Sequence, residues 1–152
     1  MSVDQAVHRR ALTVLMFAAI GIATMLSARA DEPDPDESLL MQSMEAMGEA
    51  YSKLRRQIGE SSMNEASLKL VSVMQASALA AIGHVPPKAE SLPAQERPKF
   101  ILGYKRAMVE LLAAILDLEE ALLDADNGRA RKAHKKLGTL KRRGHGKFQE
   151  ED

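Results

Sequence analysis

Two side chains that lie far apart in the sequence, the thioether of Met44 and the imidazole of His145, could together bind a metal. Thioether sulfur and imidazole nitrogen are both ligands of redox-active transition metals. The chain contains no Cys, so a thiolate ligand and the Cys-x-x-Cys-His motif of covalent haem attachment are excluded. A metal or a haem could be held only non-covalently, and only if the fold brings these two residues together.

The composition and the spacing of apolar residues predict helices that carry such residues. Hydrophobic residues make up 45% of the chain and aromatic residues only 3%, which favours an all-α domain with an aliphatic core. We expect a first helix at residues 37–58, with a seam of Leu40, Met44, Met47, Tyr51, Leu54 and Ile58. Ser62 and Glu65 resemble a capping box that would begin the second helix, which Gly83 and the prolines after it would end.

Seven apolar residues keep the same spacing in a third predicted helix: Tyr104, Met108, Leu111, Ile115, Leu118, Leu122 and Ala125. Asp126-Asn127-Gly128 predicts a turn, and a fourth helix is expected at about residues 129–147. Because short turns join the helices of each hairpin, the fold class is predicted to be all-α, an antiparallel up-down-up-down four-helix bundle.

This topology brings the start of the first helix, the connection between the second and third, and the end of the fourth to one end. The residues expected to gather there are Met44, Met47, Pro86, Pro87, Phe100, Tyr104 and His145. Two potential ligands among apolar walls suit a haem iron. Gly144 would leave room for a planar group. His134 is a weaker candidate, about three turns away and expected at the surface.

Each of these residues also has a simpler interpretation. A Met on a helix seam is usually core filler, and a His near a helix end usually lies in solvent or compensates the helix dipole. Met41, Met44 and Met47 form a Met-x-x-Met-x-x-Met run, and soft thioethers select Cu(I), so a copper-binding protein is an alternative. A haem-free bundle that acts as a chaperone or adaptor is another. An enzyme is not expected, because no Ser-His-Asp, Cys-His or Glu-x-x-His arrangement stands out.

Four segments resemble the cytochrome b562 family of periplasmic four-helix-bundle proteins. They are Met44-Glu45 with Leu40, Met47 and Tyr51; residues 74–79 followed by Pro86-Pro87-Lys88; Phe100-Ile101-Leu102-Gly103-Tyr104; and His145-Gly146-Lys147-Phe148. The resemblance implies an electron-transfer protein that binds one non-covalent haem b, with Met44 and His145 as axial ligands. It also implies that the pocket wall consists of Met47, Met74, Phe100 and Tyr104, and that Pro87 belongs to the pocket. Lys141, one turn before the His, would be the basic residue near the haem propionates.

The first thirty residues have the pattern of a secretory signal peptide. His8-Arg9-Arg10 precedes an apolar run, and Ala28-Arg29-Ala30 fits the small-x-small cleavage rule. We therefore expect a periplasmic protein with no membrane segment in its mature form; a retained N-terminal anchor is the alternative. The expected domains are a signal peptide at 1–30, a flexible acidic leader at 31–36, a haem-binding bundle at 37–148 and a tail at 149–152.

Charge differs between the last two predicted helices. The third carries the acidic residues Glu110, Asp117, Glu119, Glu120, Asp124 and Asp126, and the fourth carries the basic residues Arg129, Arg131, Lys132, Lys135, Lys136, Lys141, Arg142, Arg143 and Lys147. The simpler interpretation is attraction between neighbouring helices. The sharper one is a docking surface near the haem for an acidic redox partner protein. Nucleic acid is a poor partner for an exported protein, and a monomer is expected.

Overall fold

The computed structural model describes residues 35–149 and the side chains of residues 39–149. Its four long helices are α2 (Pro35–Leu54), α3 (Asn64–Ala81), α4 (Arg97–Leu123) and α5 (Asn127–Phe148). Two short 3-10 helices, η1 (Ser61–Met63) and η2 (Pro87–Ala89), lie in the connections. The predicted signal peptide at 1–30, residues 31–34 of the predicted leader and residues 150–152 of the predicted tail lie outside the described residues.

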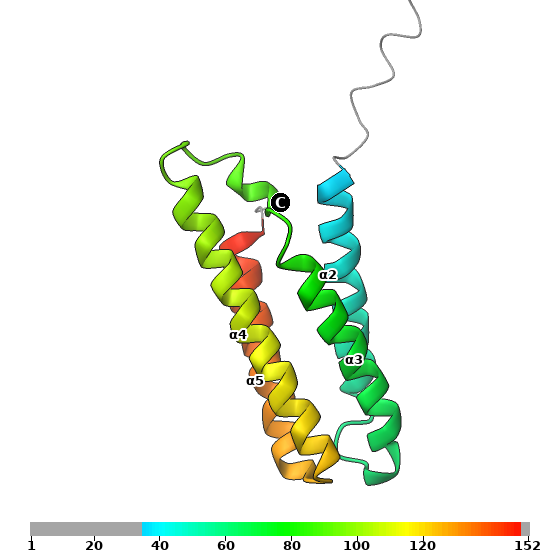
Figure 1. Cartoon of the computed structure of the whole chain (residues 1–152). Helices are drawn as coiled ribbons and strands as arrows, with labels where there is room; N and C mark the ends of the chain where they lie inside the picture. The colour runs from blue at the N-terminus through cyan, green and yellow to red at the C-terminus, as the bar shows by residue number, and fades with distance from the viewer. Residues whose placement is uncertain (1–34, 150–152) are drawn as a thin grey trace, which may run out of the picture. The chain divides into compact units, whose positions relative to one another are not determined.

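The four helices form an up-down-up-down bundle (Figure 1). Helix α2 packs on α3, α3 on α4, and α4 on α5, so the predicted fold class is confirmed. The start of α2, the connection between α3 and α4, and the end of α5 lie at the same end of the bundle, at the top of Figure 1. Within the described part of the chain, no helix is both long enough and apolar enough to cross a membrane.

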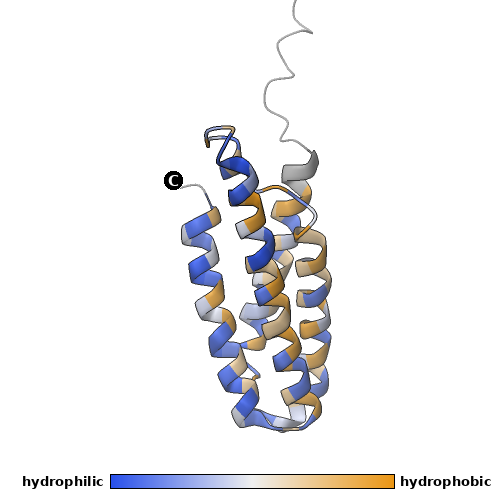
Figure 2. Cartoon of the chain, turned by 60° about the vertical axis from the view of Figure 1, so that its left-hand side comes forward, coloured by the Kyte–Doolittle hydropathy of each residue, from blue (hydrophilic) through white to orange (hydrophobic). Residues whose placement is uncertain are grey.

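The predicted seams form one core along the bundle. Its most deeply buried large side chains come from every helix: Leu54, Val71, Met74, Ile115, Leu118 and Leu137. Burying one such side chain stabilises the fold by roughly 1.5–3 kcal/mol. Helix α5 contributes mainly small residues, among them Ala130 and Ala133, and Figure 2 shows this helix, which ends at the C-terminus, as mostly hydrophilic. Helix α5 therefore brings fewer large apolar side chains to the core than its neighbours do.

Two helix ends differ from the sequence prediction. Helix α2 ends at Leu54 and continues as turns to Gly59, whose φ of 99° suits glycine. The predicted capping box is wrong: the 3-10 turn η1 intervenes, α3 begins at Asn64 without a side-chain cap, and Glu65 pairs with Lys69 at 3.0 Å instead. The backbone N–H of Asn64 instead donates to the Ser61 carbonyl oxygen inside η1.

Among the helix starts whose caps the structure describes, only that of α5 has a side-chain cap. Asp126 accepts a hydrogen bond from the backbone N–H of Arg129 at 2.9 Å. The chain reverses at Ala125, which has a positive φ of 54°, so α5 begins at Asn127 within the segment predicted to be a turn. Asp126 thereby satisfies one of the N–H groups that a helix start leaves without an intrahelical partner.

Tyr51 connects α2 to α5 midway along the bundle. Its ring stacks on the His134 ring with a centroid separation of 4.3 Å and an interplanar angle of 2°. Its hydroxyl lies over Gly138, where an added Cβ would be only 2.6 Å from the hydroxyl oxygen. His134 is 7% exposed, so its predicted surface position is wrong. Tyr51 covers it, and no feature of α5 alone reveals that.

The Asp126 cap predicts a difference between two substitutions. Asp126→Ala should lower the free energy of unfolding by about 1 kcal/mol, because the Arg129 N–H loses its acceptor. Ser62→Ala is the matched control and should change it by less than about 0.5 kcal/mol, because Ser62 caps no helix. Urea unfolding followed by circular dichroism measures both values. Equal losses in the two variants would contradict this assignment of the cap.

The buried His134 predicts a pH dependence of stability. Burial is the main cause that lowers the pKa of His134, repulsion from Arg55 adds to it, and a hydrogen bond with the Tyr51 backbone opposes it. The unfolded chain, with a His pKa of about 6.5, then binds more protons than the folded one just below that pH. Stability should therefore fall as the pH is lowered from about 7.5 towards 5.

In His134→Phe, which keeps an aromatic ring against Tyr51, this slope should become flatter. Part of the slope should persist, because the pKa of His145 is lowered as well. Urea unfolding at a series of pH values measures the slope in both proteins. Identical slopes in wild type and variant would show that His134 protonates as easily in the folded chain as in the unfolded one.

Candidate functional site

A cavity of about 1200 Å³ opens at the end of the bundle where α2 begins and α5 ends. This volume exceeds the roughly 300–1,000 Å³ of most small-molecule pockets. All four helices and the α3–α4 connection line it, mainly with the apolar residues Leu40, Met44, Met47, Met74, Pro86, Pro87, Phe100, Tyr104, Met108, Leu137, Leu140 and Phe148. The bundle thus contains a large, mostly apolar space at the end predicted from topology.

The cavity exists because the backbones of α2 and α5 make only weak contact, whereas the other neighbouring helices pack closely. Tyr51 and Met74 are among its lining residues, and both belong to the core below it. A Cβ added at Gly144 would meet no atom within 4 Å, which agrees with the room predicted beside that residue. Helix α5 therefore offers a planar group an open face near its end.

The two candidate ligands both line this cavity and come from different helices. Met44 lies on α2, is half-buried and packs against the core. His145 lies in the last turn of α5 and is exposed, although its ring is partly surrounded by protein. Partial burial, and secondarily the ammonium of Lys141, lower the pKa of His145. A lowered pKa favours the neutral imidazole, which is the form that binds a metal.

The aromatic wall is held by contacts between α3, α4 and α5. The Tyr104 hydroxyl donates a hydrogen bond to the Ala81 carbonyl oxygen at 2.8 Å, and burial raises the pKa of Tyr104 to about 12. Phe148 meets the rings of Phe100 and Tyr104 edge to face, with centroids 5.4 Å and 5.6 Å away. These three rings fix the end of α5 against α4, and thus fix the region that carries His145.

All eight residues named from the sequence line this one cavity: Met44, Met47, Met74, Pro87, Phe100, Tyr104, Lys141 and His145. Sequence reasoning did not select Tyr51, Met108 or Phe148 as wall residues, although they line it too. Met108 follows Tyr104 by one helical turn, and that spacing could have identified it. Met41 is 59% exposed at the rim while Met47 is buried, so the three thioethers of the methionine run lie at different depths.

Basic side chains surround the mouth of the cavity. Lys99 and Arg106 of α4 and Lys141 and Lys147 of α5 line it, and we call these four residues the basic rim. Lys141 Nζ lies 5.9 Å from the Tyr51 ring centroid, and Lys147 Nζ lies 5.2 Å from that of Phe148. Glu96 and Glu110 line the cavity as well, but basic residues outnumber them, which would suit a ligand with an apolar body and anionic groups at its edge.

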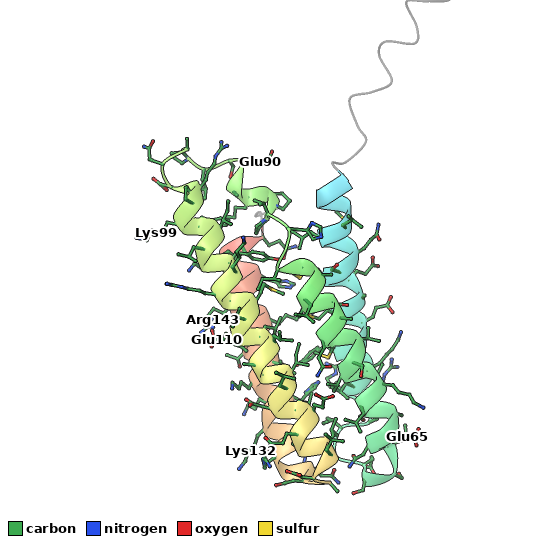
Figure 3. All side chains as sticks on the ribbon, viewed as in Figure 1. Glu65, Glu90, Lys99, Glu110, Lys132 and Arg143 are labelled. Carbon is green, nitrogen blue, oxygen red and sulfur yellow. The ribbon has the colours of Figure 1, made fainter. Side chains whose placement is uncertain are left out.

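Other basic residues of α5 are paired with acids of α4. Lys136 contacts Asp117 at 2.9 Å, Arg129 contacts Glu120 at 2.8 Å and Asp124 at 3.0 Å, and Arg143 pairs with Glu110. Figure 3 shows Arg143 and Glu110 side by side and Lys99 at the start of α4. Attraction between the two helices, the simpler of the two interpretations, therefore accounts for these pairs but not for the basic rim.

The residues present fit a haem. The macrocycle needs apolar walls and axial ligands that project from facing helices. The cavity supplies apolar walls from every helix, a thioether from α2, an imidazole from α5 and cations at its mouth. A second hollow of about 340 Å³ is lined by Asp117, Arg129, Lys132, Ala133 and Lys136. It offers neither such walls nor a ligand pair.

Comparison with known proteins identifies the family. No curated protein and no solved structure gives a significant match. The family model described as Cytochrome b562 matches residues 39–149, which include all four long helices from Leu39 onward and every residue of the cavity. Proteins of this family are typically periplasmic. Because the match spans most of the chain, the protein belongs to the cytochrome b562 family and is an electron carrier, not an enzyme, that binds haem b non-covalently.

Proposed function

We propose that this electron carrier holds its haem b between the Met44 thioether and the His145 imidazole. The observation that carries the proposal is that both side chains, one from α2 and one from α5, line the same cavity. Partial burial lowers the pKa of His145, which favours the neutral imidazole that a metal binds and supports its role as a ligand. Lys141, at the mouth of the cavity, pairs with a haem propionate in this arrangement.

The chemistry follows from the ligand set. Bound haem supplies a one-electron iron couple. Met44 and His145 would together hold the iron, and no coordination site would then be left for a substrate, so the chemistry supplied would be electron transfer without bond formation. A Met ligand favours the reduced state and raises the potential. Met47, Met74, Phe100 and Tyr104 exclude water, and Pro87 closes the wall between α3 and α4. A dry, rigid pocket reorganises little when the charge on the iron changes.

The basic rim supports a redox partner with an acidic surface. Electron transfer is fastest where the partner approaches the cofactor edge, and the rim residues surround the mouth of the cavity. Opposite charges on the two proteins would steer their encounter and orient it. The redox partner therefore docks at the end of α5 and the start of α4, through Lys99, Arg106, Lys141 and Lys147.

Export through a cleavable signal peptide completes the proposal. His8-Arg9-Arg10, the apolar run and Ala28-Arg29-Ala30 support cleavage before Asp31. The bundle would then begin after a short acidic leader, and the carrier would act in the periplasm.

The ligand assignment is tested by the visible absorption spectrum. Wild-type protein should give a low-spin b-type spectrum, oxidised and reduced with dithionite, because both axial positions are filled. Met44→Ala and His145→Ala should each turn high-spin or lose haem. Met41→Ala, which removes an exposed thioether one turn away, is the control and should keep the wild-type spectrum. A low-spin spectrum in either ligand variant would overturn that residue's assignment.

The basic rim is tested with small redox reagents of opposite charge. In Lys99→Glu/Lys147→Glu, oxidation by ferricyanide should slow by roughly 3–10-fold at low ionic strength, and reaction with hexaammineruthenium should speed up. Lys132→Glu/Lys135→Glu makes the same change in net charge at the far half of α5 and should have a smaller effect. High ionic strength should remove the difference in reaction rate between the two double variants. Equal effects of the two pairs, measured by stopped flow, would show that only net charge matters.

A further inference from the structure

Tyr51 closes the inner end of the cavity on the side of α2. Of the α2 residues that line the cavity, it lies farthest from the start of the helix. It follows Met44 by seven residues, so the two side chains share one face of α2 and stand about 10 Å apart along its axis. Between them Gly48 also lines the cavity, and a Cβ added there would meet no atom within 4 Å. This face of α2 is therefore open at Gly48 and closed at Tyr51.

The Tyr51 side chain fits into a notch on α5. Its ring stacks on the His134 ring with centroids 4.3 Å apart, and Lys141 Nζ lies 5.9 Å from its centroid. Its hydroxyl lies over Gly138, where an added Cβ would be 2.6 Å from the hydroxyl oxygen and 3.6 Å from Cζ. His134, Gly138 and Lys141 are spaced by four and three residues, so they lie on one side of α5. They form the notch, which holds the ring as a hole between packed helices holds a knob.

Gly138 is the residue that admits the Tyr51 hydroxyl. It is buried near the middle of α5, where glycine makes a helix less stable than alanine would. A ring without the hydroxyl would not need this glycine, because its nearest atom would stay 3.6 Å from an added Cβ, which is an ordinary contact. The glycine is therefore explained by the placement of Tyr51 and not by the packing of the two helices alone.

We propose that Tyr51 is a positioning residue for the cofactor: its ring is the floor of the haem slot and sets how deep the haem lies between Met44 and His145. The inference rests on the proposed ligand pair. Two ligands hold an iron well only when the iron is level with both, and such placement requires supporting side chains that cannot move. The notch on α5 supports Tyr51 in this way. Contact with the ring also holds the ammonium of Lys141, which is the group proposed to pair with a propionate.

A methyl group added at Gly138 tests the floor role. In Gly138→Ala the new Cβ would displace the Tyr51 hydroxyl and tilt the ring. The haem should then dissociate about 10-fold faster, because its iron would no longer be level with both ligands. Transfer of haem to an excess of apomyoglobin measures this rate. The midpoint potential should also fall, because a weaker Met44 bond favours the reduced iron less.

The same methyl group without the hydroxyl is the matched control. Tyr51→Phe should keep the wild-type dissociation rate and potential. Tyr51→Phe/Gly138→Ala should restore both quantities to their wild-type values, since no oxygen is left to clash with the new Cβ. If circular dichroism shows that Gly138→Ala does not fold, Tyr51→Ala takes its place. It removes the floor and should release haem faster than Tyr51→Phe does.

Three results would overturn the floor role. The first is a wild-type dissociation rate and potential in Gly138→Ala, and the second is an equal effect of that substitution with and without the Tyr51 hydroxyl. The third is an equal dissociation rate in Tyr51→Ala and Tyr51→Phe. Failure of the ligand pair would look different, because Met44→Ala or His145→Ala would then keep a low-spin spectrum whatever the Tyr51 and Gly138 variants do.

Discussion

Each helix of this bundle must bury an apolar seam against its neighbours, and the size of the seam residues decides where the bundle is filled. Towards the end with the two short turns, Leu54, Val71 and Leu118 fill the space between the helices. Towards the other end α5 has Gly144 on its seam, and the backbones of α2 and α5 make only weak contact. The cavity therefore results from small residues in a regular bundle, since no irregular backbone is needed to form it.

Tyr51 separates the filled part of the bundle from the open part. Its ring covers His134 and its hydroxyl rests on Gly138, so α2 and α5 are joined at this level. Beyond it, the rings of Phe100, Tyr104 and Phe148 hold the end of α5 against α4. Met44 and His145 are thus placed by two different sets of contacts, one on each side of the cavity. If Met44 and His145 hold the haem as proposed, electron transfer would benefit from this rigidity, because ligands that cannot move keep the two oxidation states similar.

Most of the fold follows from the spacing of Leu, Met and Ile, because each seam must face the core whatever its partners are. The topology could be predicted from the short turns. That topology in turn predicted that Met44 and His145 would line one cavity. Contacts between helices were harder to predict. The burial of His134 depends on Tyr51, which is a residue of another helix. The predicted Ser62 cap does not form because a 3-10 turn intervenes, and no local sequence pattern predicts that turn. Phe148 belongs to the wall because of where α4 lies, which the sequence of α5 does not contain.

The position of Tyr51 also has a consequence for assembly. The core on its closed side, with Leu54, Val71 and Leu118, is packed without any cofactor. That half of the bundle can fold as soon as the chain is free to do so. The open half encloses a cavity that the cofactor would fill, so cofactor binding would contribute directly to the stability of the start of α2 and the end of α5. With no covalent attachment, the fraction of loaded protein then follows the supply of haem.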